Sequence, residues 1–193
     1  PGDKLHSPAG PLPGLRGPDF YRRKSLANVK PAEIADLVES SLLPAGKGSD
    51  FYKDEFVKRF GEEKVVTDIL GEPAILSLRT FLMDKTPGAP EAWKFTKAGH
   101  GESIPLMEEI LQQPYEVWLT PQKNESGKIR LAKRYVGIWK TTDKKRIGGL
   151  AVYEVVDGVF QGVTNFIPLA KGEPHLDYVE RQRKGLLLYG KGK

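Results

Sequence analysis

The order of apolar and polar positions predicts a helical first half and a β-rich second half. Apolar residues recur at three- and four-residue spacing in three stretches, and this spacing places them on one face of a helix. The stretches are 34–42, with Ile34, Leu37, Val38 and Leu42; 51–60, with Phe56, Val57 and Phe60 before a stop at Gly61; and 102–113, which ends at Pro114. Short extended pieces are expected at 65–66 and 74–76.

From Tyr115 onward the pattern changes to β-rich runs separated by turn residues. The sequence Asp157-Gly158 between apolar pairs indicates a tight hairpin, because its primed turn needs positive φ at both central residues. Short connections favour antiparallel neighbours. We therefore predict an α+β fold in which N-terminal helices precede a four- to five-stranded antiparallel sheet. The expected strands are 115–120, 128–140, 148–156, 159–167 and 186–189.

Proline and glycine dominate the beginning of the chain. The first 28 residues hold five prolines interleaved with four glycines, so no regular element is expected to propagate there. We interpret residues 1–28 as a linker or arm, 29–61 as a helical subregion, and 62–193 as the domain that carries the sheet.

Charge is distributed unevenly along the chain, although the net charge is only +5. Residues 121–150 hold nine basic and two acidic residues, a net +7, whereas 31–120 hold nine basic and sixteen acidic residues, a net −7. A short basic segment in an acidic chain is typical of a local surface that binds a polyanion. A solvated pair of strands with lysine-rich turns explains the same charge, so charge alone leaves both interpretations open.

Composition removes several classes of chemistry. The chain has no cysteine, which excludes disulfides, thiolate nucleophiles and cysteine-ligated metals, and its three histidines limit a histidine-rich metal site. The motifs of nucleotide hydrolases, dinucleotide oxidoreductases, serine hydrolases and zinc proteases are missing. No run of 18 apolar residues occurs, so no membrane contact is expected. We expect no metal and no cofactor, which leaves proton transfer beside cations or a binding role.

His100 is the first candidate for chemistry. It stands between Gly99 and Gly101, where a loop enters the predicted helix 102–113. Glycine lets the backbone approach a ligand closely, and a histidine there can act as a general acid or base near neutral pH. The alternative is a surface histidine whose glycines serve only the turn.

Arg134 is the second candidate, in the long β-run 128–140. Alternation places Lys128, Arg130 and Arg134 on one face and Lys133, Tyr135 and Trp139 on the other. Because apolar Val136 and Ile138 share the face of Arg134, the strand is expected to be central and the guanidinium partly buried. A buried guanidinium needs a carboxylate or a phosphate. Glu116 is a candidate structural partner, whereas cations beside aromatic rings on one sheet are typical of RNA binding.

Further candidates lie in the last third of the chain. Thr164 falls on a predicted hairpin strand, where its hydroxyl can orient a phosphate or serve simply as a common strand residue. Tyr178, Arg181 and Gln182 share a helical face, and His175, which precedes that helix, is a second titratable group. Arg183 is explained structurally by the dipole of a helix that ends before Gly185.

An ordered series of short segments resembles a known family. The segments are 67–77 (TDILGEPAILS), 99–101 (GHG), 113–118 (QPYEVW), Arg134-Tyr135, 164–168 (TNFIP) and 178–189 (YVERQRKGLLLY). In this order they resemble the phage-associated barnase–EndoU–colicin–RelE-like (BECR) nuclease domain, which is often the C-terminal part of phage head-morphogenesis proteins. The resemblance covers about residues 50–190.

The resemblance implies a metal-independent endoribonuclease that acts by general acid–base transesterification through a 2′,3′-cyclic phosphate. It implies His100 as base or acid, Arg134 and Arg183 as phosphate-binding cations, and Thr164 as hydroxyl donor. Because the family often has another basic residue at the position of His100, Glu116 and His175 are alternative proton carriers. The expected substrate-binding residues are Lys97, Lys133, Tyr135, Arg181 and Tyr189.

We expect the partner to be RNA, either tRNA or another cellular RNA. An immunity protein or phage head proteins are expected as further partners. The expected place of action is the bacterial cytoplasm, reached from a phage virion or as a toxin. A non-catalytic nucleic-acid-binding or head-assembly module is the alternative function, and it predicts salt-sensitive binding without product.

Overall fold

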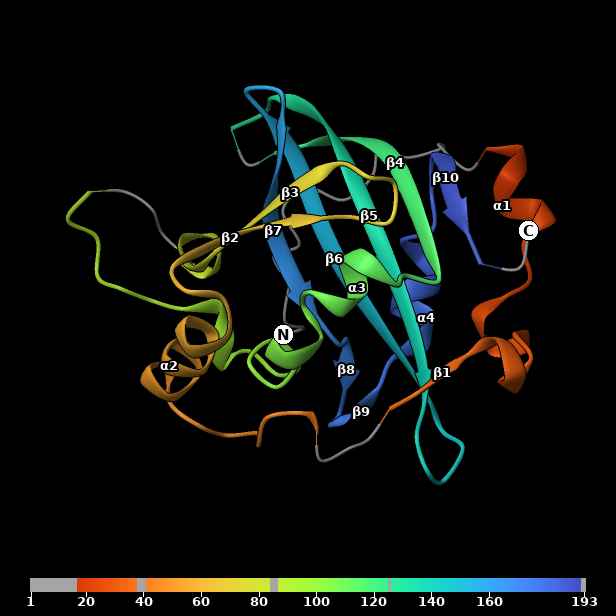
Figure 1. Ribbon diagram of the computed structural model, residues 1–193, viewed down its shortest axis with the longest axis horizontal. Helices are drawn as coiled ribbons and strands as arrows, with labels where there is room; N and C mark the ends of the chain where they lie inside the picture. The colour runs from red at the N-terminus through yellow and green to blue at the C-terminus, as the bar shows by residue number, and fades with distance from the viewer. Residues whose placement is uncertain (1–16, 38–40, 84–86, 125, 192–193) are drawn as a thin grey trace.

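A mixed sheet forms the centre of the molecule (Figure 1). The computed structural model describes residues 17–37, 41–83, 87–124 and 126–191. Within them the main sheet has eight strands, seven of which follow the order β10-β4-β5-β6-β7-β3-β2. Five neighbouring strands form one antiparallel run: β4 (Glu116–Lys123), β5 (Ile129–Lys140), β6 (Arg146–Val156), β7 (Val159–Phe166) and β10 (Leu186–Gly190). These are the five predicted strands, and the predicted α+β class is confirmed.

The sheet has more strands than predicted. Strands β2 (Glu63–Thr67) and β3 (Pro73–Ser77) form a hairpin, and β3 pairs in parallel with β7. Strand β1 (Ala35–Asp36) pairs in parallel with the end of β5, while β8 (Leu169–Ala170) and β9 (Glu173–Pro174) form a separate small sheet. Parallel pairing joins segments far apart in the sequence, so local turn signals could not predict it.

The helices are short except for α2 (Ser49–Phe60), which confirms the predicted helix ending at Gly61. The prediction that Val57 packs inward is wrong, because Val57 is exposed and Tyr52 is buried in its place. The other helical elements are α1 (Pro18–Arg22), α3 (Glu109–Gln112), α4 (Leu176–Arg181) and the 3₁₀ turns η1 (Leu26–Asn28), η2 (Pro31–Glu33), η4 (Leu78–Phe81), η5 (Lys94–Thr96) and η6 (Ile104–Leu106).

Two predicted helices are wrong. Residues 34–37 continue from η2 into β1 instead of forming a helix, and Val38 lies outside the described residues. The predicted helix 102–113 is reduced to η6 and α3. Pro105 explains the second difference, because a proline inside a helix removes a backbone donor and clashes with the preceding turn. The arm predicted for residues 1–28 lies partly outside the described residues, and its remainder forms α1 and η1, with Leu26 buried.

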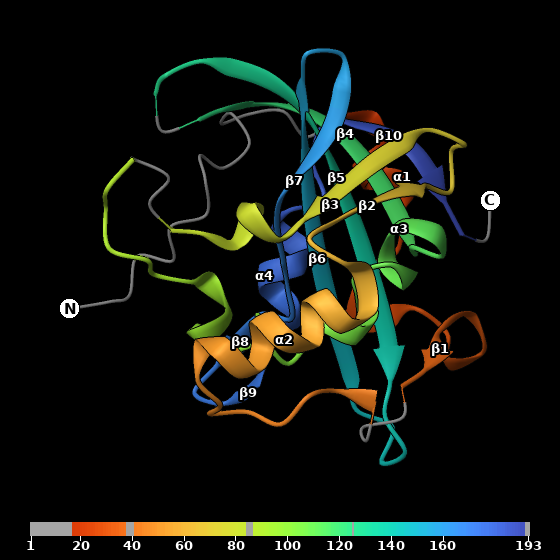
Figure 2. The same cartoon turned by 60° about the vertical axis from the view of Figure 1, so that its left-hand side comes forward.

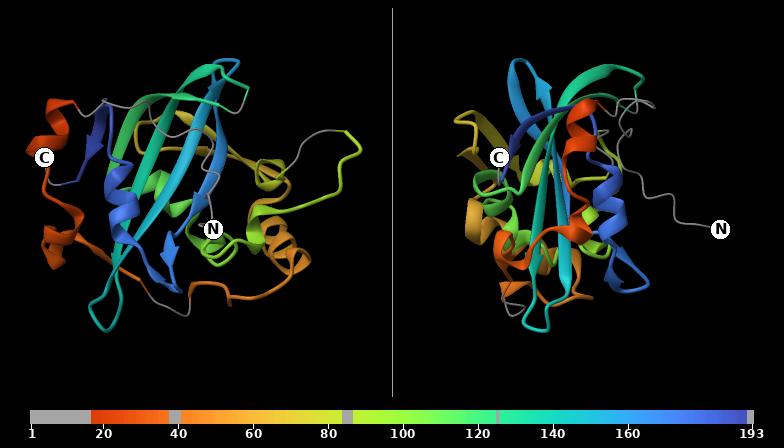
Figure 3. Two further views of the ribbon diagram at one scale, coloured as in Figure 1. Left: turned by 180° about the vertical axis from the view of Figure 1, so that it is seen from behind. Right: turned by 90° about the vertical axis from the view of Figure 1, so that its right-hand side faces the viewer.

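The sheet separates two hydrophobic cores. Helix α4 covers one face, which we call the α4 face, and packs there with Val179 against strand residues that include Val136, Leu150 and Phe166. The opposite or α3 face packs against α3 through Ile110 and other residues. Figures 1 and 3 show α3 and α4 on opposite sides of the strands, with the β2–β3 hairpin crossing the α3 face. This arrangement gives the two faces different chemistry.

A third core is aromatic and lies under α2, beside the sheet (Figure 2). It joins Tyr52 and Phe56 of α2 to rings that include Phe81 and Phe95. The β6–β7 connection confirms the predicted primed turn, since Asp157 and Gly158 both have positive φ, 51° and 79°. None of the helices in the described residues is long and apolar enough to cross a membrane.

Candidate active site

A row of paired strand residues defines the site on the α4 face. The register aligns Trp118 of β4, Arg134 of β5, Val152 of β6 and Thr164 of β7 side by side. Arg134 is 1% exposed and Thr164 is 5% exposed, so both are part of the core layer beneath α4. The predicted central position of β5, with a buried arginine, is confirmed.

Arg134 is held by amides and not by a carboxylate. Its Nη2 donates to Gln122 Oε1 at 2.8 Å, and its Nη1 donates to Gln182 Oε1 just beyond α4. Its Nε has no hydrogen-bond partner among the described residues. Burial lowers the pKa of the Arg134 guanidinium to about 10, so it is still charged at neutral pH. The prediction that Glu116 pairs with Arg134 is wrong, because the carboxylate of Glu116 binds Arg23 and Arg183.

A second layer of the site holds Glu154. Its carboxylate accepts a hydrogen bond from Gln122 Nε2, and Oε2 lies 3.9 Å from Nη1 of Arg130. The negative charge of Glu154 also favours the charged form of Arg134. Sequence reasoning missed Gln122 and Glu154. The available signal was a lone acidic residue at an alternate position inside the apolar run 148–156.

His100 joins the same face through an aromatic contact. Its ring stacks on Phe166 with centroids 4.7 Å apart and an interplanar angle of 3°, and Phe166 in turn contacts the ring of Tyr178. Burial lowers the pKa of His100 to about 4, and the positive charges of Lys97 and Lys94 add to this effect. The imidazole is therefore neutral at pH 7.

The glycines that flank His100 serve packing. A Cβ on Gly99, which has φ +80°, would lie 1.9 Å from the carbonyl oxygen of Ile167. A Cβ on Gly101 would lie 2.6 Å from the ring of Tyr52. The loop thus needs glycine because it packs on β7 and α2, and this explanation is sufficient without a ligand.

Comparison with known families shows which family the chain belongs to. Residues 52–190 match the family described as phage-Barnase-EndoU-ColicinE5/D-RelE like nuclease2. The chain belongs to this family. The BECR-type nuclease domain includes Gln122, Arg134, Glu154, Thr164 and Gln182. No curated protein and no solved structure matches the chain.

Arg183 of the nuclease domain belongs to a buried ion-pair network that does not include Arg134. Its Nε and Nη2 donate to Glu116 at 2.7 and 2.8 Å, and its Nη1 donates to Glu180 at 2.6 Å. Arg23 and the indole of Trp118 also donate to Glu116. Burial alone would lower the pKa of Arg183, but the bonds to Glu116 outweigh burial and raise it. Each guanidinium nitrogen of Arg183 and each carboxylate oxygen of Glu116 therefore already takes part in a hydrogen bond within the protein.

Lys133 and Tyr135 lie on the α3 face, opposite Arg134. Lys133 Nζ lies 2.8 Å from Asp68 and 2.5 Å from Glu72, and the Tyr135 hydroxyl donates to Asp68 at 2.6 Å. Burial opposes the ionisation of Asp68, but the hydrogen bonds from Lys133 and Tyr135 outweigh it and lower the pKa. Asp68 Oδ1 also accepts the backbone N–H groups of Leu70 and Glu72. These residues attach the β2–β3 loop to the sheet.

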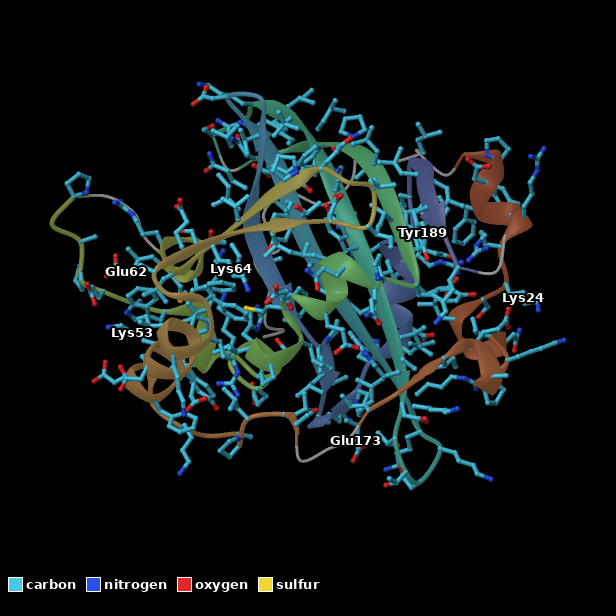
Figure 4. The ribbon with its side chains drawn as sticks, viewed as in Figure 1. Lys24, Lys53, Glu62, Lys64, Glu173 and Tyr189 are labelled. Atoms are coloured by element: carbon cyan, nitrogen blue, oxygen red, sulfur yellow. The ribbon has the colours of Figure 1, made fainter. Side chains whose placement is uncertain are left out.

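The remaining predicted residues are spread over the domain. Lys97 is half-buried near His100, and Arg181 is exposed on α4. His175 is half-buried at the start of α4, with its ring 6.3 Å from that of Tyr178. Figure 4 shows Tyr189 on β10 at the edge of the sheet, where it pairs with Val117 and packs in the α3-face core. The described residues contain no group of three or more histidine, cysteine or acidic side chains placed to bind a metal.

Proposed function

We propose that this nuclease domain is a metal-independent endoribonuclease in which Arg134 binds the scissile phosphate. One observation carries the proposal. Arg134 is a buried charge with an unsatisfied Nε, and among the described residues it makes no ion pair. Since an uncompensated buried cation is costly, a phosphate oxygen is the ligand that this site favours.

Glu154 is the general base in this proposal. It takes the proton from the ribose 2′-hydroxyl, the 2′-oxygen attacks phosphorus, and the bond from phosphorus to the 5′-oxygen breaks. The leaving oxygen takes a proton from water, and the products are a 2′,3′-cyclic phosphate and a 5′-hydroxyl. Arg134 stabilises the charge that develops on the phosphoryl oxygens. Thr164, in the same row, is the proposed hydroxyl donor to them.

His100 has a positioning role in the proposal. A group with a pKa of about 4 is a weak base at neutral pH, and stacking on Phe166 fixes its ring. The stack orients Phe166 and thereby Tyr178 of α4, which interacts electrostatically with Arg134. Lys97 beside His100 adds positive potential for the RNA backbone.

RNA cleavage in EDTA tests the proposal. The wild-type domain should generate 2′,3′-cyclic phosphate ends, and Arg134→Gln should reduce kcat/KM by at least about 100-fold. Arg59→Gln is the matched control, because Arg59 lies on α2 and, among the described residues, forms an ion pair only with Glu55 in the preceding turn. Circular dichroism and thermal unfolding verify that both variants are folded. Intact RNA at high enzyme concentration, or equal activity of the two variants, would overturn the proposal.

The same experiment separates a non-catalytic module from an enzyme. A nucleic-acid-binding or head-assembly module would bind RNA or DNA with strong salt dependence and yield no product. We propose RNA of the bacterial cytoplasm as the target, reached from a phage virion or as a toxin. Expression in bacteria should then be toxic, and Arg134→Gln but not Arg59→Gln should relieve the toxicity. An immunity protein would relieve it as well.

A further inference from the structure

A cavity of about 380 Å³ opens at the end of the β5–β6 hairpin, far along β5 from Arg134. Lys140, Lys144 and Arg146 line it together with Asp36 and the backbone turn at Thr141. We infer that this hairpin cavity binds a backbone phosphate of the same RNA strand whose scissile phosphate lies at Arg134. The inference rests on the proposed function for its ligand, and on the charges below for its location.

The hairpin cavity carries three cations and one carboxylate. Asp36 Oδ1 lies 3.4 Å from Lys140 Nζ, which also donates to the carbonyl oxygen of Pro31. Arg146 donates from Nη2 to the carbonyl oxygen of Val29, but its buried Nε has no partner among the described residues. Lys144 is exposed and forms no ion pair with any described residue. Two positive charges are therefore uncompensated, which favours an anionic ligand.

Lys144 occupies a backbone position suited to glycine. Its φ is +67°, and its N–H donates to the carbonyl oxygen of Thr141 to close the turn. A side chain in the left-handed region is unfavourable, so lysine lowers stability here relative to glycine. Lysine at this position places a positive charge at the lining of the cavity.

The geometry connects the hairpin cavity to Arg134. Lys140 and Arg134 lie on one strand and one face, six residues apart, so about 20 Å separates them. Helix α4 spans the interval: Gln182 follows its last turn and contacts Arg134, whereas Leu176 packs over Gly148, which is two residues from Arg146. The left panel of Figure 3 shows α4 in front of the strands. Exposed Arg181 on α4 offers the RNA a further cation between Arg134 and the hairpin cavity.

Lys171 provides a matched control for Lys144. It too is an exposed lysine with positive φ, +51°, in the turn between β8 and β9, and it does not line the cavity. The nearby Glu173, labelled in Figure 4, lies 3.8 Å from Lys145. Lys144→Gly and Lys171→Gly remove the same charge and relieve the same backbone conformation. Only the first removes a residue of the hairpin cavity.

Binding is measured by fluorescence anisotropy with a labelled single-stranded 2′-O-methyl RNA, which cannot be cleaved by 2′-oxygen attack. Lys144→Gly should raise Kd about fivefold and reduce the slope of log affinity against log salt by about 0.7, as expected for one lost phosphate contact. Its Tm should rise by about 2–4 °C because the strain is removed. Lys171→Gly should show the same rise in Tm and a Kd within about twofold of wild type.

Substrate length distinguishes this inference from the proposed function. Cleavage of a dinucleotide, which cannot span about 20 Å, should be unaffected by Lys144→Gly. Equal losses of affinity in the two glycine variants, or an unchanged Kd for Lys144→Gly, would overturn the cavity assignment while leaving cleavage at Arg134 intact. If no RNA is cleaved and Lys144→Gly still weakens binding selectively, the nuclease proposal fails and the cavity remains.

Discussion

Arg134 Nη2 donates to Gln122 Oε1 at 2.8 Å, so an uncharged side chain holds a buried cation of the α4 face. Gln122 also donates to Glu154 and therefore separates the arginine from the nearest carboxylate. A direct ion pair would neutralise Arg134. With the amide between them, Arg134 has no ion pair among the described residues, although the carboxylate of Glu154 is close enough to favour its charged form.

Substitutions of Glu154 and His100 should show which of the two residues is the general base. Glu154→Gln retains an acceptor for Gln122 but removes the proton acceptor, so kcat should fall by about 100-fold or more. His100→Gln should reduce kcat by less than about tenfold, because a positioning role is only partly lost. Single-turnover cleavage of RNA measures both effects. The reverse order of losses would assign proton transfer to His100.

Burial of His100 should make stability depend on pH. The pKa of His100 is about 4 in the folded protein and about 6.5 when unfolded, so only the unfolded state binds the proton between these values. The contribution of His100 to the free energy of unfolding should therefore be fully present above about pH 6.5. The free energy of unfolding should decrease by about 3 kcal/mol as the pH falls to about 4. Urea unfolding at several pH values measures the decrease. His100→Gln should remove most of it, and an unchanged slope would contradict the buried neutral imidazole.

Glu116 should be a stability residue. Glu116→Gln leaves the guanidinium groups of Arg183 and Arg23 without their shared carboxylate, and loss of one buried partner typically costs about 3–5 kcal/mol. Denaturant unfolding should show this loss, while kcat of the folded fraction is expected to be nearly unchanged. A loss of activity at full stability would instead support a catalytic role for Arg183 or Glu116.

The two carboxylates that bind Lys133 should contribute unequally to stability, because Asp68 is buried and Glu72 is not. Asp68→Asn should destabilise the domain by about 3 kcal/mol, because it leaves the buried ammonium group with only the half-exposed Glu72. Glu72→Gln should cost less than about 1 kcal/mol, since solvent screens its charge. Because the pKa of Asp68 is lowered, its contribution is complete above about pH 4 and is lost as the pH falls through the folded-state pKa. Equal losses in the two variants would contradict this division.

Much of the fold could be predicted from local signals. The runs that became β4 to β7, β10 and α2 follow two- and 3.6-residue periods, and Asp157-Gly158 marked its own turn. The helices predicted at 34–42 and 102–113 are wrong for two reasons that apolar spacing does not reveal. Residues 35–36 pair with a strand of the sheet, and Pro105 interrupts the second segment. The β2–β3 hairpin was visible only as two short extended pieces.

The site was predicted in part. Alternation along β5 placed Arg134 on an apolar face and indicated that it needs an anion. His100 and Thr164 were candidates from their positions in the sequence, and the family resemblance gave them their roles. Sequence could not reveal that Arg183 and Glu116 bind each other, since they are 67 residues apart and the contact depends on how the segment between α4 and β10 is placed beside β4. It also could not select Glu154, whose relevance comes from its place across the strands.

By itself, the sequence determined the α+β class, the absence of thiol chemistry and the strand that carries the central arginine, because composition and periodicity are local properties. Tertiary structure decided which charges are neutralised. The cations of the basic segment 121–150 have different surroundings. Lys133 forms an ion pair with Asp68, Arg134 donates hydrogen bonds to two glutamines, and other cations line the hairpin cavity. This division depends on strand register and on which face each side chain occupies, and neither is fixed until the strands pair.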